Sequence, residues 1–110
     1  MPRRAVAAEV ADFMPIPDDV VAWVNRHFRD IDRTTAIGLL EDAVDERDEP
    51  VEPRLLRCAL IGSRADIDRL TELVEELRID SEDVILSGEY ESRAGNLVKI
   101  RDLNDPLEDV

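Results

Sequence analysis

The chain has 110 residues, which suits a single domain and is too short for two separate cores of ordinary size. Hydrophobic residues make up 44% of it and charged residues 37%, so we expect a compact core. Acidic residues outnumber basic ones by 27 to 14, and the net charge of −13 argues against a nucleic-acid partner, because phosphate binding depends on Lys and Arg. No segment is apolar enough to span a bilayer, and a single cysteine cannot form an internal disulfide. We therefore expect a cytoplasmic protein with no membrane partner.

The chain divides into three parts by composition. We expect an N-terminal arm or short helix over residues 1–15, a single helical domain over 16–103 and an acidic tail over 104–110. Within the domain, Pro17 and the two acids that follow it suit the start of a helix over 18–28. The apolar side chains of this helix lie largely on one side: Val20, Val21, Trp23, Val24 and Phe28.

A second helix follows after a short break. Asp30 or Asp32 can cap it, and apolar residues at three- and four-residue steps carry it to about residue 45. The next segment, DERDEPVEP (45–53), is dense in charge and contains two prolines. It is typical of a connector inside one domain.

The third and fourth predicted helices form an antiparallel pair, and the third is expected to lie at the centre of the fold. Pro53 fits the first turn of a helix that is apolar nearly all round until Gly62 ends it, which is typical of a buried helix. Cys58 lies in its middle and is therefore expected to be a small buried hydrophobe without catalytic function. After the short loop SRAD, Asp66 can cap a helix whose apolar stripe is Ile67, Leu70, Leu73, Val74 and Leu77.

The sequence SEDVILSGEYE fits two templates. Ser81 and the acids after it favour a helix over 82–91, whereas strands at 84–90 and 97–103 could pair as a β-hairpin. We favour the helix. The expected fold is then a single all-α domain of four or five short antiparallel helices around the helix that begins at Pro53, with an α+β fold carrying the C-terminal hairpin as the alternative.

One segment resembles a calcium-binding loop. In DIDRTTAIGLLE (30–41), oxygen-bearing side chains stand at the positions that an EF-hand uses: Asp30, Asp32, Thr34 and Glu41. The sixth position is Thr35 where the loop needs glycine, and the apolar pattern suggests that a helix begins inside the segment. These departures from the calcium-loop pattern argue against calcium, which we keep as an alternative. We expect neither another metal nor a cofactor, because one cysteine and one histidine cannot supply a zinc site.

Acidic and aromatic side chains provide the candidates for an interaction surface. The residues proposed for it are Trp23, Glu72, Glu75, Glu76, Glu89, Tyr90 and Glu91. The first three of these glutamates lie opposite the leucine stripe of their helix, so we expect them to face solvent.

The segments RCALIGSRADIDRL and DVILSGEYE, followed by VKIRDL, resemble a group of small uncharacterised bacterial helical proteins. The resemblance covers about residues 53–103. It implies a compact helical domain and no particular reaction.

These features favour a non-enzymatic interaction or regulatory module, monomeric or homodimeric, whose acidic face meets a basic protein partner. One alternative is a small enzyme that uses scattered carboxylates, His27 or Tyr90. The other alternative is a calcium-responsive module built on residues 30–41.

Overall fold

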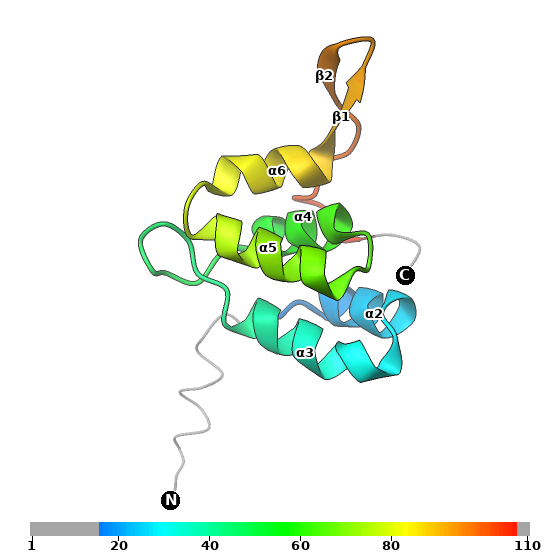
Figure 1. The fold of residues 1–110 in the computed structure, drawn as a ribbon, viewed down its shortest axis with the longest axis vertical. Coiled ribbons are helices and arrows are strands. Elements are labelled where there is room, and N and C mark those ends of the chain that lie inside the picture. The colour runs from blue at the N-terminus through cyan, green and yellow to red at the C-terminus, as the bar shows by residue number, and fades with distance from the viewer. Residues whose placement is uncertain (1–15, 108–110) are drawn as a thin grey trace, which may run out of the picture.

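The computed structural model describes residues 16–107, so the predicted arm at 1–15 and the last three residues lie outside it. Within this part of the chain there are five helices and one C-terminal hairpin (Figure 1). The helices confirm the all-α class, and the alternative was right that a C-terminal hairpin is present. The elements are α2 (Asp18–His27), α3 (Asp30–Glu41), α4 (Pro53–Ser63), α5 (Ile67–Leu77), α6 (Ser81–Glu89), β1 (Tyr90–Arg93) and β2 (Asn96–Lys99).

The helix starts agree with the predicted signals at some positions and differ at others. Pro53 opens α4, and the Asp66 carboxylate caps α5 by accepting hydrogen bonds from two backbone N–H groups. The start of α6 is capped by Asp80 and not by Ser81. The expected cap of α3 is wrong, because this helix begins at Asp30 itself and has no side-chain cap.

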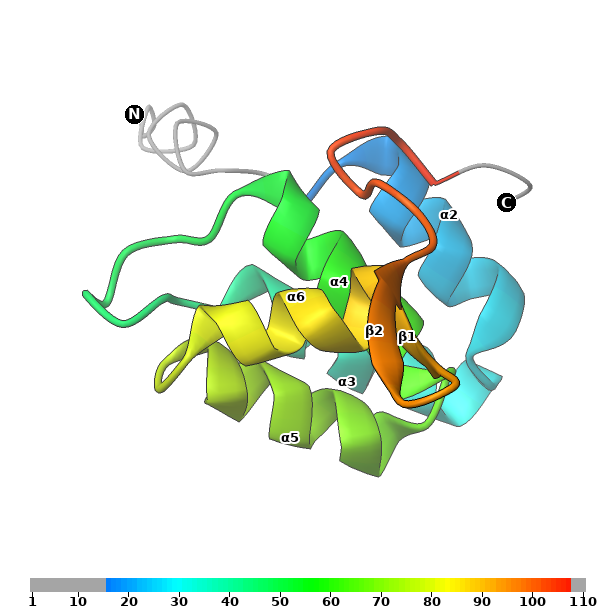
Figure 2. The ribbon, with the colours of Figure 1, turned by 90° about the horizontal axis from the view of Figure 1, so that it is seen from above.

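The helix α4 lies at the centre of the helical body, where it packs against α2, α5 and α6 (Figure 2). Its closest neighbour is α6. A Cβ built on Gly88 of α6 would lie 2.6 Å from the Cα of Cys58, so only glycine allows the two helices to come this close. Cys58 is fully buried at this crossing, as expected. The core that surrounds α4 contains Val20, Val24, Phe28, Leu40, Leu60, Leu70, Leu77 and Val84, among others.

Gly62 does not end α4, contrary to the prediction. The helix continues to Ser63, and the chain turns at Arg64 and Ala65, which both have positive φ values of 54° and 63°. Gly62 instead faces α6, where an added Cβ would lie 3.0 Å from the Cβ of Ser87. The glycine thus serves helix packing and not helix termination.

The hairpin begins where α6 ends. The predicted helix over 82–91 is confirmed up to Glu89, and the hairpin boundaries of 84–90 and 97–103 are wrong, because pairing joins Tyr90–Arg93 to Asn96–Lys99. The turn residues Ala94 and Gly95 have φ values of 52° and 84°, as a type I′ turn requires. Figure 1 shows this hairpin projecting from the helical body.

Residues 100–107, which we call the C-terminal strap, contain neither helix nor strand. Leu103 and Leu107 are nevertheless buried and belong to the core. Within the described part of the predicted acidic tail, Leu107 therefore packs against the domain, whereas residues 104–106 are exposed.

Candidate functional site

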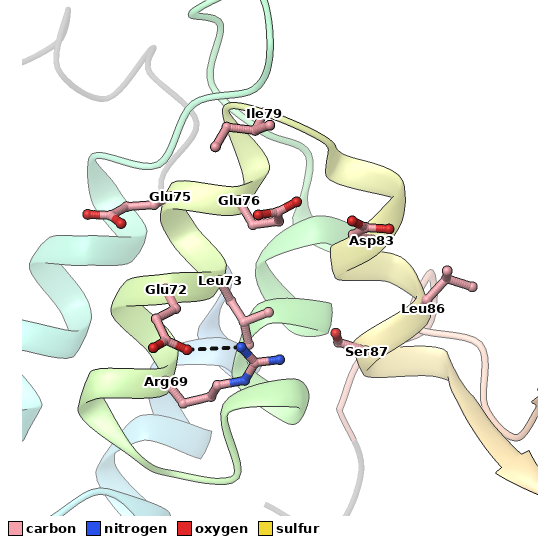
Figure 3. Close-up of a pocket in the computed structure, with 9 residues that line it drawn as sticks. All are labelled: Arg69, Glu72, Leu73, Glu75, Glu76, Ile79, Asp83, Leu86 and Ser87. Atoms are coloured by element: carbon pink, nitrogen blue, oxygen red, sulfur yellow. Dashed lines mark hydrogen bonds and ion pairs between the residues drawn. The ribbon is translucent and has the colours of Figure 1, made fainter.

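A groove of about 600 Å³ lies between α5 and α6 (Figure 3). Its lining comes from both helices and the turn between them: Arg69, Glu72, Leu73, Glu75, Glu76, Ile79, Asp83, Leu86 and Ser87. Its volume lies in the range of about 300–1,000 Å³ that is common for ligand sites.

Carboxylates dominate the polar part of this groove. Figure 3 shows Glu76 of α5 and Asp83 of α6 turned toward each other across it. Glu72 forms an ion pair with Arg69, in which Nη1 lies 3.0 Å from the carboxylate. Among residues 16–107, no Lys, Arg or His side chain forms an ion pair with Glu75, Glu76 or Asp83. The groove therefore carries more negative charge than its own arginine neutralises.

The pKa of Glu76 reflects this arrangement. Partial burial raises the pKa of this carboxyl above its ordinary value, and the neighbouring carboxyls of Asp83 and Asp80 raise it further. Arg69 acts in the opposite direction but does not compensate. A positive group placed between Glu76 and Asp83 would relieve the repulsion between them.

Apolar side chains line the same groove. Leu73 is buried, whereas Ile79 is 71% exposed and Leu86 is 38% exposed. Large apolar side chains with this exposure next to a groove provide contact area for a ligand. The groove thus offers carboxylates and apolar contacts side by side.

The predicted interaction residues are divided between separate places. Glu72, Glu75 and Glu76 lie together in the lining of the α5–α6 groove. Trp23 is half-buried on α2, where its ring lies 4.3 Å from that of His27. This aromatic pair is not part of the groove lining.

The cluster predicted at residues 89–91 does not form a common surface. Tyr90 and Glu91 line a second hollow, next to Arg101. The prediction that Glu89 is available to a partner is wrong, because its side chain is completely buried. It accepts hydrogen bonds from the Arg54 guanidinium and from the backbone N–H of Leu103.

Two carboxylates pair with arginines, the fully buried Glu89 and the partly buried Asp19. Arg54 donates to both carboxylate oxygens of Glu89 at 2.9 and 2.7 Å, and this pairing lowers the pKa of Glu89. Arg57 donates to both oxygens of Asp19 at 2.9 and 3.2 Å. Burial alone would raise the pKa of Asp19, but hydrogen bonds from Arg57 and the backbone N–H of Leu107 lower it overall.

The calcium interpretation does not hold in the structure. Residues 30–41 form the continuous helix α3, so the oxygens of Asp30 and Glu41 lie at its two ends and cannot surround one ion. Within residues 16–107, no group of three or more His, Cys, Asp or Glu side chains is placed to hold a metal.

The named catalytic candidates are not brought together either. His27 is exposed at the end of α2, and Tyr90 lies at the start of the hairpin. Burial, together with the nearby Glu89 carboxylate, raises the pKa of the Cys58 thiol to about 12, so this sulfur is a poor nucleophile.

No helix in the described part is sufficiently long and apolar to cross a bilayer.

Six groove residues were absent from the predicted interaction surface: Arg69, Leu73, Ile79, Asp83, Leu86 and Ser87. Ile79 lies two residues after Leu77, the last residue of α5, and outside the apolar stripe, which is a signal that an apolar side chain there faces outward. Asp83 was interpreted only as part of an acidic first turn.

Comparisons with family models, with curated proteins and with solved structures found no match.

Proposed function

We propose that this protein is an interaction module whose α5–α6 groove binds a basic segment of a partner protein. The observation that carries the proposal is the pair Glu76 and Asp83, which face one another without a cationic partner among residues 16–107. An Arg side chain suits this position, because its planar guanidinium can donate to two carboxylates at once.

Apolar contacts add to the charge complementarity. Ile79 and Leu86 lie in the same lining as the carboxylates, so the best ligand carries Leu, Ile or Met near its Arg or Lys. The apolar contact supplies the desolvated centre of the interface, and the charges supply its specificity.

The charge of the whole chain acts in the same direction. A net charge of −13 attracts basic partners over a distance and accelerates their encounter, and added salt screens this attraction. Affinity for the basic segment should therefore fall as ionic strength rises.

The experiment is a titration with fluorescent peptides that contain Arg and Leu at helical spacing. The variant Glu76→Gln/Asp83→Asn removes both facing charges. The control Glu82→Gln/Glu49→Gln also removes two charges, one from the first turn of the same helix α6, but neither residue lines the groove. We expect the groove variant to weaken binding about tenfold or more, and the control to change it less than twofold. Equal losses in both variants would reduce the proposal to non-specific charge attraction.

The groove supports binding better than it supports catalysis. The enzyme alternative relied on scattered carboxylates, His27 or Tyr90, and of these only carboxylates reach the groove. A general acid or base with a raised pKa is present in Glu76, but the nearest hydroxyl in the lining, Ser87, has no histidine beside it in that lining.

A further inference from the structure

The C-terminal strap is held by side chains of the helical body, in the manner of a bound peptide. The Glu89 carboxylate accepts the backbone N–H of Leu103 at 2.9 Å, and the Asp19 carboxylate accepts that of Leu107 at 2.9 Å. The Arg57 guanidinium donates to the carbonyls of Leu103 and Asn104 at 3.1 and 3.2 Å. Backbone recognition of this kind depends on a short segment that turns at residues 103–105 and carries two buried leucines, and not on the chain that supplies it.

We call the groups that hold the strap the strap seat: Asp19, Arg57 and Glu89. Each of the two carboxylates in the seat also has an arginine partner on α4, so these two ion pairs do not involve the strap. In addition, the side chain of Arg101 in the strap donates to the backbone carbonyl of Gly88 in α6 at 2.6 Å.

The connection between the strap and the body is strained and exposed. Apart from the half-buried Tyr90, the residues of β1 and β2 are exposed, and they join through the turn Ala94–Gly95. Ala94 has a φ of 52°, a left-handed conformation that is unfavourable for any residue with a Cβ. Opening this turn would release the strain, and short strained hinge loops favour exchange of segments between copies.

We propose that two copies of this chain exchange residues 96–107, so that the strap of each copy occupies the strap seat of the other. In the exchanged dimer, β2 of one copy pairs with β1 of the other, and every strap contact is remade between chains. The dimer loses no strap contact and no longer needs Ala94 in the left-handed conformation.

The position of the hairpin suits this exchange. It projects from the body, so the two acidic bodies meet through their hairpins and stay apart (Figure 1). At physiological salt, charges more than about 8 Å apart are largely screened. The repulsion between two chains of charge −13 is thereby reduced.

The first test uses concentrated full-length protein, warmed to just below its melting temperature, cooled, and separated by size-exclusion chromatography with light scattering. We expect a dimer. Ala94→Asn creates the Asn-Gly sequence preferred in type I′ turns and so stabilises the closed hairpin. It should lower the association constant of the dimer about tenfold or more. The matched control is Ala65→Asn, which relieves a similar φ of 63° in the α4–α5 loop and should leave dimerisation unchanged. Absence of a dimer, or equal effects of both variants, would overturn the proposal.

The second test distinguishes exchange from ordinary association. Leu103→Asp disables the strap and leaves the seat intact, whereas Arg57→Ala disables the seat and leaves the strap intact. When the two chains are mixed, only exchange can place an intact strap in an intact seat. We expect a 1:1 heterodimer with a higher melting temperature than either chain alone. If the mixture behaves as the sum of its parts, whether or not each chain folds, exchange is ruled out.

Discussion

The guanidinium of Arg54 donates hydrogen bonds to both carboxylate oxygens of Glu89, and that carboxylate has no exposed surface. The arrangement joins the first turn of α4 to the last residue of α6, 35 residues later in the chain. The same carboxylate accepts the N–H of Leu103. One side chain thus connects two helices and the C-terminal strap.

Removing this carboxylate should destabilise the fold. Glu89→Ala leaves Arg54 and the Leu103 N–H without their acceptor, and we expect a loss of about 3 kcal/mol in the free energy of unfolding, because breaking a buried pair strands its partner. Guanidinium denaturation measures the loss. As a control, Glu91→Ala alters an exposed residue of the hairpin and should cost less than about 0.5 kcal/mol. Equal losses in the free energy of unfolding at the two positions would show that the buried ion pair contributes no more to stability than an exposed side chain does.

Acid should weaken the fold through the two carboxylates that are paired with arginines, Glu89 and Asp19. The pKa values of Glu89 and Asp19 are lowered in the folded state, so their contribution is complete above the ordinary values of 4.5 and 3.8. It is lost as the pH falls below those values, toward the folded-state pKa. Urea midpoints measured from pH 6 to pH 2.5 should therefore drop steeply below about pH 4.5. Asp19→Asn should make that drop shallower, and an unchanged slope would contradict the assignment.

Glu76 should respond to pH with the opposite sign. Its raised pKa means that the folded protein holds this proton more tightly than the unfolded chain, so its contribution to stability is lost as the pH rises above 4.5. Carbonyl and carboxyl NMR shifts of Glu76 would report its titration directly. Binding of a basic peptide should move that titration to lower pH, because the cation favours the ionised form. A titration midpoint that stays fixed on binding would show that the cation does not reach Glu76.

Two glycines in helices should respond differently to alanine. Gly88→Ala places a methyl group 2.6 Å from the Cα of Cys58, and separating α4 from α6 should cost about 1–3 kcal/mol or more. Gly38→Ala in α3 meets nothing within 4 Å and should stabilise by about 1 kcal/mol, because alanine is the better helix former. Thermal unfolding of both variants tests the pair. A stable Gly88→Ala protein would contradict the close crossing of the two helices.

The Cys58 thiol should resist modification in the native protein. Its burial and its raised pKa of about 12 leave almost no thiolate at neutral pH. Reaction with a thiol reagent should therefore follow the rate at which the fold opens. A cysteine introduced at the exposed Ser92 should react at the rate of a free thiol in the same sample. Similar rates for the two sulfurs would show that the α4–α6 crossing opens readily.

Much of the helical architecture could be predicted from local patterns. The burial of α4 follows from the apolar residues that this helix carries on nearly all of its sides. The Asp66 cap and the apolar stripe locate α5 within a residue. The helix end at Gly62 was mispredicted, because glycine is used there for contact with α6 and not for a left-handed turn. Local sequence does not show which of these two uses a glycine serves.

The candidate site could be predicted only in part. The spacing of Glu72, Glu75 and Glu76 places them on one face of α5, but the second wall of the groove comes from α6, whose position depends on long-range packing. Glu89 shows the same difficulty. A glutamate between glycine and tyrosine has no local sign of burial, because its partners Arg54 and Leu103 are distant in sequence.

The most direct test of the proposed function is to map peptide binding on the isotope-labelled protein by NMR. An Arg- and Leu-containing peptide is titrated into the protein at physiological salt, and backbone amide shifts are followed. We predict saturating shift changes that centre on Glu76, Ile79 and Asp83 and are abolished by Glu76→Gln/Asp83→Asn. Small, unsaturated changes spread over all acidic surfaces, or changes centred on another face, would contradict the assignment of the groove as a binding site.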